Sequence, residues 1–375
     1  MRIKIVNDIF LDYKGESYNI GGVETYLKNL YFLLASNGYD VTIFQKAIND
    51  FEKKHDGIHV VGLGGNGHIL NDNAFLEKFK KNKLSSNDVV IWGSDQRSLK
   101  IKNKTICIQH GIGFDTEAFS SGLRRYIPRL KLVRLYKFMQ RYRALRLFEK
   151  SDYAVCVDYN FLNWYRTYRK TPDKRIKVIP NFSIIPDERV PLHNKEIKIL
   201  FARRFVKRRG LDIFIPAARR ILSSFDNVTI TFAGAGEEIV SIFDLKDDFK
   251  DRVFITSYSA SDSLEFHKNY DISVIPSIGS EGTSLSLLEA MAAGCCVIAT
   301  NVGGMTNIIL DKFNGLLCNP NEHDLFDCMQ TVITSDNQRA LLQKNAYNSV
   351  KTAFSKDVWD EHWLTFINDI TRKKL

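Results

Sequence analysis

The sequence alternates short apolar runs with longer segments of helical periodicity, and the alternation recurs on both sides of a proline-bearing interruption. This arrangement predicts βαβ units and a parallel sheet. The expected strands before the interruption are residues 4–6, 41–44, 59–62, 89–92, 104–108, 153–157 and 177–179. Those after it are residues 197–202, 228–233, 253–256, 272–275 and 297–299. The sequence therefore predicts an α/β protein with two consecutive parallel sheets.

The interruption, residues 180–195, contains three prolines and no sustained periodicity. Such a segment is typical of a linker, and 375 residues suit two domains. We expect one domain over residues 1–182 and a second over 183–356. Residues 357–375 are expected to form a final amphipathic helix.

The composition predicts a soluble globular protein, with 44% hydrophobic and 26% charged residues. No apolar run of about 18 residues is long enough to span a membrane, and the N-terminus lacks the pattern of a signal peptide. We therefore expect a cytoplasmic protein. The six cysteines lack metal-binding or disulfide spacing and are expected to be reduced and buried.

The net charge of +10 is unevenly distributed. Residues 1–190 carry a net charge of +12 and residues 191–375 a net charge of −2. An anionic partner should therefore bind the N-terminal half.

Residues 123–150 contain ten Lys or Arg residues and one acidic residue. Leu135, Phe138, Tyr142 and Leu145 recur there at helical spacing, which predicts a basic amphipathic helix. Such a helix could attach to an anionic membrane surface. The alternative is that the apolar stripe belongs to the core and the basic face is merely solvated.

Three glycine or arginine motifs follow expected strands. Gly21 and Gly22 open a helix, where glycine and free amides suit a phosphate, although a plain turn would look the same. Arg203 and Arg209 lie in a basic turn that could bind an anion or be only solvated. Gly234 and Gly236 end another strand, where a lone G-x-G is weak evidence of a site.

Glu281 and Glu289 are eight residues apart, which would place them near one face of a continuous helix. A loop position for Glu281 and a helical position for Glu289 fit the sequence better. Carboxylates accept paired hydrogen bonds from sugar diols, whereas the structural alternative is an exposed and a capping glutamate. His110 ends a strand at the edge where open α/β sheets bind ligands, although a histidine there can be structural.

Four ordered segments resemble the retaining glycosyltransferases of family 4, which have the GT-B fold. They are residues 21–24 (GGVE), 109–113 (QHGIG), 202–210 (ARRFVKRRG) and 280–294 (SEGTSLSLLEAMAAG), and residues 178–182 (VIPNF) resemble the family's linker. The resemblance implies two Rossmann-like domains facing across a cleft. The N-terminal domain would bind the acceptor, the C-terminal domain would bind the nucleotide-sugar donor, and the last helix would cross back to the N-terminal domain.

The resemblance also implies roles for individual residues. Arg203 and Arg209 would hold the donor diphosphate together with Gly21 and Gly22, and Glu281 would bind hydroxyls of the transferred sugar near His110. The backbone amides of Thr283, Ser284 and Leu285 would make further contacts with the donor. The Glu289 carboxylate would bind the ribose, and the chain at Gly234 and Gly236 would pass near the nucleoside. The sequence departs from the family pattern at three places. Arg209 replaces the family's lysine, Ala202 replaces its glycine, and Thr283-Ser284 replace its aromatic-glycine pair.

The implied reaction is retaining transfer of a hexose or N-acetylhexosamine, with a UDP-sugar favoured as donor and GDP-mannose second. The acceptor would be a glycan, favoured as lipid-linked, in synthesis of a cell-surface polysaccharide such as lipopolysaccharide or capsule. The family reaction is front-face displacement without a cofactor, and no metal is expected. The protein would act in the cytoplasm, peripherally on the inner face of the plasma membrane.

Two alternatives remain open at this point. A nucleotide-sugar epimerase or a phosphorylase can use the same fold, because fold does not determine reaction. A basic nucleic-acid-binding protein would explain the charge but not the glycine and glutamate motifs, and the sequence contains no recognised nucleic-acid module. We therefore expect no nucleic-acid partner.

Overall fold

The structure is a computed structural model. It describes residues 1–19, 21–114, 126–129, 131–169, 175–186, 196–259, 262–279 and 281–372. Parts of four predicted segments lie outside the described residues, namely residues 123–125 and 130 of the basic segment, 187–195 of the linker, Ser280 of the glutamate motif and 373–375 of the last helix.

The chain forms two compact units, which are described separately below. Unit 1 comprises Met1–His110, Glu117–Ile179 and Trp363–Leu375, and unit 2 comprises Gly111–Thr116 and Pro180–His362. The division after Ile179 falls three residues before the boundary expected from the sequence. The last helix begins in unit 2 and ends in unit 1.

Unit 1 is built on an eight-stranded sheet in the order β3-β4-β2-β1-β5-β6-β7-β8. Its strands are β1 (Arg2–Val6), β2 (Asp40–Lys46), β3 (Phe51–His55), β4 (Ile58–Leu63), β5 (Val89–Trp92), β6 (Thr105–Gln109), β7 (Tyr153–Cys156) and β8 (Ile176–Val178). Its helices are α1 (Gly22–Ser36), α2 (Asp72–Lys83), α3 (Tyr126–Arg129), α4 (Val133–Phe148), α5 (Tyr159–Arg166) and the 3-10 turn η1 (Asp95–Arg97). In the central strand β1, Ile5 pairs with Ile43 of β2 and Ile91 of β5, both in parallel.

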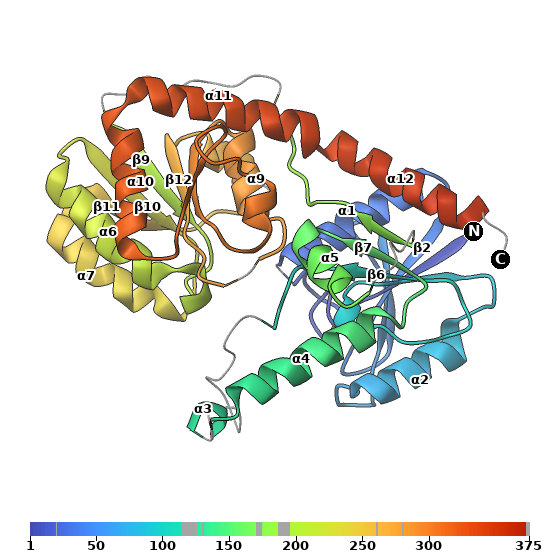
Figure 1. The fold of residues 1–375 in the computed structure, drawn as a ribbon. Helices are drawn as coiled ribbons and strands as arrows, with labels where there is room; N and C mark the ends of the chain where they lie inside the picture. The colour runs from blue at the N-terminus through green and yellow to red at the C-terminus, as the bar shows by residue number, and fades with distance from the viewer. Residues whose placement is uncertain are drawn as a thin grey trace. The chain divides into compact units, whose positions relative to one another are not determined.

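Helices cover both faces of the unit 1 sheet. Figure 1 shows α1 and the C-terminal part of α12 (Lys356–Arg372) on one side of it, with α2 and α4 on the other. Helix α1 buries Tyr26, Leu27 and Leu30 from its apolar stripe. The indole Nε1 of Trp363 donates to the Tyr26 hydroxyl at 2.7 Å, which ties α12 to α1.

Unit 2 is built on a six-stranded, wholly parallel sheet in the order β11-β10-β9-β12-β13-β14. Its strands are β9 (Ile197–Ala202), β10 (Val228–Ala233), β11 (Val253–Thr256), β12 (Ile272–Ile275), β13 (Cys296–Thr300) and β14 (Leu316–Cys318). Its helices are α6 (Leu211–Ser224), α7 (Val240–Phe249), α8 (Ser263–His267), α9 (Leu285–Ala292), α10 (Glu322–Thr334), α11 (Asp336–Ala353) and the start of α12. The described part of unit 2 also contains the 3-10 turns η3 (Lys207–Arg209), η4 (Glu237–Ile239), η5 (Lys250–Arg252) and η7 (Gly303–Asn307).

Unit 2 has a hydrophobic core on each face of its sheet, and the strands contribute alternate side chains to the two cores. Ile298 of β13 belongs to the core that contains Phe214 of α6 and Met329 of α10. Its neighbour Val297 belongs to the core that contains Met291 of α9. Because successive side chains of a strand point to opposite faces, these cores lie on opposite sides of the sheet.

The structure confirms the α/β class and the two parallel-sheet domains, and it adds two strands that the sequence did not predict. Strand β3 is antiparallel to β4 and consists mainly of exposed, charged residues, so it lacks the apolar pattern of a buried strand. Strand β14 has only three residues. All six cysteines are free thiols, five of them buried, as predicted. Among the described residues, no helix has the length and apolarity needed to span a membrane.

Candidate functional site

The carboxyl ends of parallel strands meet at one edge of a sheet, and this is where open α/β sheets bind ligands. In unit 2 the loop after β9 carries Arg203 and Arg209, and the loop after β12 carries Ser277 and Glu281. Strands β9 and β12 are neighbours in the sheet. The topology therefore brings these two loops together, although Arg203 and Glu281 are 78 residues apart in sequence.

Glu281 is the centre of a compact ionic cluster, which we call the Arg-Glu cluster (Arg203, Arg209 and Glu281). Nη2 of Arg203 donates to both carboxylate oxygens of Glu281, at 2.7 Å to Oε1 and 2.6 Å to Oε2. Nη1 of Arg209 forms a second ion pair with Oε1, and the Ser277 hydroxyl donates to the same oxygen. The cluster holds two cations and one anion, so its net charge is positive.

Burial and charge have opposite effects on the Glu281 carboxyl. Its side chain is 9% exposed and that of Arg203 is 4% exposed. Burial by itself would raise the pKa of Glu281, but the guanidinium groups of Arg203 and Arg209 lower it to about 2. Burial also lowers the pKa of Arg203. The carboxylate is therefore ionised throughout the neutral range.

Arg203 retains hydrogen-bonding capacity beyond this ion pair. Within the described part of the chain, its Nη1 atom is buried and has no hydrogen-bond partner. A buried donor without a partner is energetically costly. The cluster is therefore suited to an additional acceptor, and an anionic group would complement its net positive charge.

Glu289 lies apart from this cluster in its contacts. It is inside α9, whereas Glu281 precedes that helix, so the two carboxylates do not share one continuous helical face. The Ser263 hydroxyl donates to Oε2 of Glu289 at 2.8 Å. Burial raises the pKa of Glu289, the opposite of the shift at Glu281. The two members of the E-x7-E motif thus occupy different electrostatic environments.

Thr283, Ser284 and Leu285 form the junction between the Glu281 loop and α9. Thr283 and Ser284 are buried, and Leu285 is the first residue of the helix. Ser284 is the N-cap residue but makes no side-chain capping hydrogen bond. The Thr283 carbonyl accepts a hydrogen bond from the Asn181 side chain. These contacts fix the backbone next to the Arg-Glu cluster.

Gly234 and Gly236 pack against the backbone that carries Arg203. Both have positive φ, at 153° and 155°. A Cβ at Gly234 would lie 2.1 Å from the Arg203 carbonyl oxygen, and one at Gly236 would lie 2.2 Å from that of Phe205. Their need for glycine is therefore explained by chain packing around the cluster, while contact with a nucleoside stays a prediction.

Sequence reasoning missed several residues that position this site. Gly304 donates its amide to the Glu281 carbonyl at 2.6 Å, and a Cβ there would lie 2.6 Å from the Gly282 carbonyl carbon. The Gly303-Gly304 pair follows a strand, the same signal that drew attention to Gly234. No comparable sequence signal marks Ser277 or Ser263, whose hydroxyls contact the two glutamates.

Unit 1 places His110 directly after β6, at the carboxyl edge of its own sheet. Its Nε2 lies 2.9 Å from the carbonyl oxygen of Gly93, the residue that follows β5. Its ring packs edge-on against the Tyr26 ring, with 5.4 Å between the ring centroids. Burial lowers the pKa of His110 to about 4, so the imidazole is neutral near pH 7. Gly21 is the extended N-cap of α1 and Gly22 its first residue, one turn before Tyr26.

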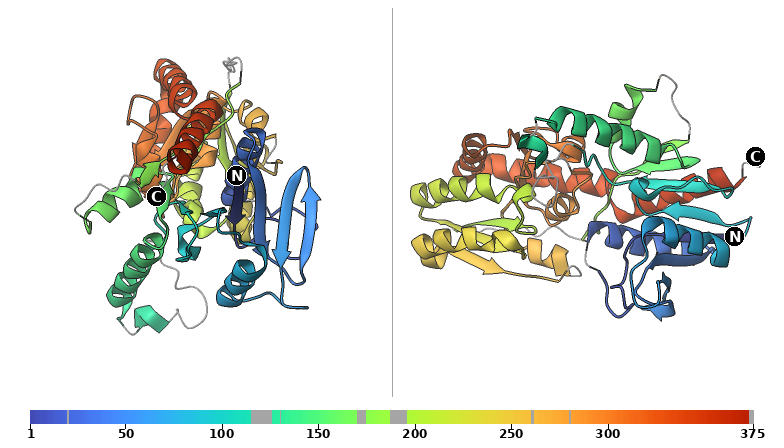
Figure 2. Two further views of the ribbon diagram at one scale, coloured as in Figure 1. Left: turned by 90° about the vertical axis from the view of Figure 1, so that its right-hand side faces the viewer. Right: turned by 90° about the horizontal axis from the view of Figure 1, so that it is seen from below.

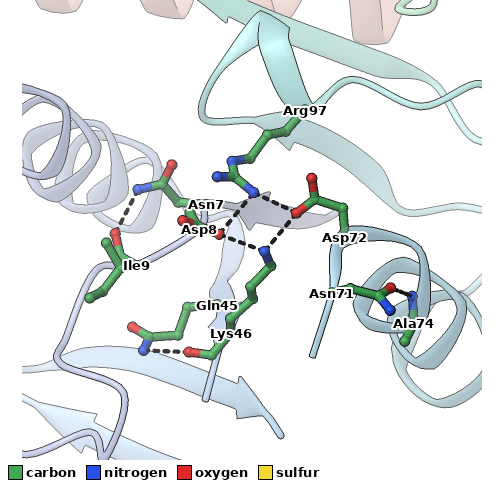
Figure 3. A network of polar contacts seen from close by, with 9 residues as sticks. All are labelled: Asn7, Asp8, Ile9, Gln45, Lys46, Asn71, Asp72, Ala74 and Arg97. Carbon is green, nitrogen blue, oxygen red and sulfur yellow. Dashed lines mark hydrogen bonds and ion pairs between the residues drawn. The ribbon is translucent and has the colours of Figure 1, made fainter. Parts of the chain in front are cut away.

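A second charged group at this edge of unit 1 was not predicted (Figure 3). The Lys46 ammonium contacts Asp8 at 3.0 Å and Asp72 at 2.6 Å. Arg97 contacts the same two carboxylates at 2.8 Å and 2.7 Å. We call these four residues the unit 1 network. They come from four separate loops or element ends, which is why no local motif announces them.

Matches to known proteins are consistent with this geometry. Residues 20–182 match Glycosyltransferase Family 4, and residues 185–349 match Glycosyl transferases group 1. The chain is 28% identical to an uncharacterized glycosyltransferase of Methanocaldococcus jannaschii over 57% of this chain and 53% of that protein. It is 25% identical to the UDP-Gal:alpha-D-GlcNAc-diphosphoundecaprenol alpha-1,3-galactosyltransferase of Escherichia coli, over 66% of this chain and 65% of that one. The alignments thus span between half and two thirds of these curated relatives.

The fold matches a solved structure over nearly its whole length. Sucrose-phosphate synthase from Thermosynechococcus elongatus superimposes with a TM-score of 0.75 at 17% identity, covering 99% of both chains. The two family matches lie on either side of residues 183–184 and together account for most of the sequence. The chain is a glycosyltransferase of family 4, with a group 1 glycosyltransferase domain in its C-terminal half.

Proposed function

We propose that this glycosyltransferase transfers a hexose or N-acetylhexosamine, with retention of configuration, from a UDP-sugar to a lipid-linked glycan. GDP-mannose is the second candidate donor. The product would belong to a cell-surface polysaccharide such as lipopolysaccharide or capsule, made at the inner face of the plasma membrane. The observation that carries the donor part of this proposal is the Arg-Glu cluster with its buried, incompletely bonded Arg203.

The donor diphosphate is proposed to bind the Arg-Glu cluster. Arginine forms short, charge-assisted bonds to phosphate oxygens, and Arg203 and Arg209 both lie at the ligand-binding edge of the unit 2 sheet. Glu281 would hold the arginine side chains in place and bind hydroxyls of the transferred sugar. Glu289 would bind the ribose. Residues 183–356 would thus act as the donor domain.

The proposed reaction is front-face displacement. The acceptor oxygen bonds to the anomeric carbon on the face from which the diphosphate departs, and the bond from that carbon to the diphosphate oxygen breaks. The acceptor proton passes to the leaving phosphate. Arg203 and Arg209 would stabilise the charge that develops on the phosphate, and Gly22, as the start of α1, would add backbone amides.

The acceptor is proposed to bind unit 1, which covers most of residues 1–182 with the end of the last helix. His110 would lie beside the transferred sugar as a neutral imidazole, and the polar groups of the unit 1 network offer hydrogen bonds to sugar hydroxyls. A diphosphoundecaprenol-linked sugar is named as the acceptor of the E. coli relative, which supports a lipid-linked acceptor here. No nucleic-acid partner is proposed.

No cofactor or metal is proposed. Among the described residues, no group of three or more His, Cys, Asp or Glu side chains could hold a metal ion. Assaying transfer in the presence of excess EDTA would test this prediction, and activity that depends strictly on added Mg²⁺ or Mn²⁺ would contradict it.

The function is tested by product analysis. Purified protein is incubated with UDP-glucose, UDP-galactose, UDP-N-acetylglucosamine or GDP-mannose and a diphosphate-linked N-acetylglucosamine acceptor with a short lipid chain. The anomeric coupling constant of the product is then measured by NMR. An α-linked product from an α-linked donor is expected. An inverted linkage would contradict the mechanism, and a sugar epimer without transfer would support the epimerase alternative.

A further inference from the structure

Helix α4 exposes an unusual concentration of large apolar side chains. Leu135, Phe138, Met139 and Tyr142 are 55%, 64%, 59% and 55% exposed. In α11, by contrast, Leu341 is the single exposed large apolar side chain. The interpretation of this stripe as core is therefore wrong for Leu135, Phe138 and Tyr142, and right only for Leu145, which is buried.

These four side chains form one continuous row, because they occupy positions i, i+3, i+4 and i+7. At about 100° per residue, all four fall within about 60° of Leu135. We call this row the α4 outer face. A contiguous apolar surface of this kind marks an interaction site rather than the scattered exposure found on most proteins.

Arginines border the α4 outer face on both sides. Arg134 and Arg141 lie on one side of the row and Arg143 on the other, at the helical angles that follow from the same geometry. All three are exposed. Helix α4 contains five basic residues and no acidic residue, so its outer surface is apolar in the middle and positive at the margins.

The C-terminal turn of α4 attaches the helix to unit 1. Leu145 and Phe148 are buried, and the Phe148 ring packs against Phe161 at 4.8 Å and Tyr165 at 5.1 Å, both on α5. Figure 1 and both views of Figure 2 show α4 at the periphery of unit 1. The C-terminal turn is thus anchored while the row from Leu135 to Tyr142 faces outward.

We infer that the α4 outer face docks on an anionic membrane surface. An apolar row bordered by arginine is the pattern of a helix that lies in the membrane interface, with its apolar side chains among the acyl chains and its cations at the headgroups. The absence of acidic residues from α4 removes repulsion from anionic lipid. A nucleic acid would use the arginines but not the apolar row. This docking does not depend on the proposed reaction.

Flotation with vesicles tests the inference directly. The vesicles contain phosphatidylcholine alone or with 30% phosphatidylglycerol, and neither glycan acceptor nor nucleotide sugar is present, so the result is independent of transferase activity. The full-length protein is expected to float with the anionic vesicles, about tenfold more than with the neutral ones. Protein that remains unbound to anionic vesicles at low salt would overturn the inference.

Two surface variants distinguish the apolar and ionic contributions. The double substitution Phe138→Ser and Met139→Ser is expected to reduce binding at least tenfold, and Arg141→Gln with Arg143→Gln is expected to reduce both binding and its salt dependence. Leu341→Ser, an exposed residue of unit 2, is the matched control and should bind like the wild type. Equal binding by all variants would overturn the inference. Concentration-dependent self-association of the wild type would also overturn it, if the protein does not bind vesicles and the double substitution Phe138→Ser and Met139→Ser abolishes the self-association.

Insertion can be measured separately. In a Phe138→Trp variant, the new indole should shift its emission to the blue on anionic vesicles and be quenched by brominated lipid. Three of the four native tryptophans, Trp92, Trp359 and Trp363, are buried in the protein, so they should respond little. Leu341→Trp is the control and should show neither change. An unquenched Phe138→Trp signal on bound protein would contradict the proposed orientation.

Discussion

The Arg-Glu cluster of unit 2 and the unit 1 network use the same chemistry in different surroundings. In the first, Arg203 and Glu281 are 4% and 9% exposed, whereas in the second Arg97 and Asp72 are 36% and 59% exposed and only Lys46 approaches burial, at 11%. A buried ion pair must offset the lost hydration of both charges, and removing one partner leaves an uncompensated charge. An exposed pair contributes little and is screened by salt. The comparison indicates that only the unit 2 cluster depends strongly on every member.

The largest expected effect follows from removing Arg203. Arg203→Ala should lower kcat about 100-fold or more, because a preorganised charge on the leaving phosphate is lost. It should also lower the free energy of unfolding by about 3 kcal/mol, because Glu281 remains buried with fewer partners. Steady-state kinetics and urea denaturation measure the two effects. Arg204→Ala, an exposed neighbour, is the control. A fully active Arg203→Ala enzyme would refute the donor-site proposal.

The second prediction concerns the pH dependence of the cluster. The pKa of Glu281 is lowered to about 2 from its ordinary value of 4.5. Its ionised form therefore contributes stability that is fully present above about pH 5 and is lost as pH falls toward 2. At pH 7, Glu281→Gln should lower the free energy of unfolding by about 3 kcal/mol. The difference from wild type should shrink on acidification, and a difference independent of pH from 7 to 3 would be inconsistent with an ionised Glu281.

His110 of unit 1 provides a third test, in which folding favours the neutral form of the group rather than the charged form. Burial lowers its pKa from 6.5 to about 4, so folding favours the neutral ring. The stability associated with this ring is complete above pH 6.5 and is lost as pH falls toward 4, by about 3 kcal/mol. NMR of histidine-labelled protein, with His110→Asn to assign the signal, should detect no titration of His110 between pH 5.5 and 8. A midpoint near 6.5 would show that the ring is solvated.

The smallest effect is expected in the unit 1 network. Asp72→Asn should lower the free energy of unfolding by less than about 1 kcal/mol, and the loss should disappear in 1 M NaCl, because Asp72 is exposed. Chemical denaturation at low and high salt measures this. A salt-independent loss comparable to that of Glu281→Gln would remove the contrast between the two clusters.

The apolar pattern of the sequence predicts the buried architecture but not every exposed element. Central strands such as β10 are continuous apolar or β-branched runs, and they lie where the sequence predicts them. The edge strand β3 was missed because three of its five residues are exposed. Helix α4 was predicted as a helix, but the exposure of its apolar stripe could not be predicted. Leu135, Phe138 and Tyr142 have the same helical spacing whether the stripe faces a core or solvent.

The site residues that stand in short sequence motifs could be predicted from the sequence. Arg203, Arg209, Glu281 and Glu289 stand in recognisable motifs, and the structure brings the first three into contact. The unit 1 network could not be predicted, because Asp8, Lys46, Asp72 and Arg97 come from four separate loops or element ends and meet only through the strand order of the sheet. The same applies to Ser277 and Gly304, whose roles depend on which backbone lies beside them.

The central claim is that the Arg-Glu cluster binds the diphosphate of a nucleotide-sugar donor. The most direct measurement is calorimetric titration of the wild type and Arg203→Ala with UDP, GDP, ADP and CMP, in metal-free buffer. The account predicts micromolar binding of one nucleoside diphosphate, UDP being favoured, and at least tenfold weaker binding to Arg203→Ala. The absence of binding to any of the four by folded wild-type protein, or unchanged binding by folded Arg203→Ala, would contradict it.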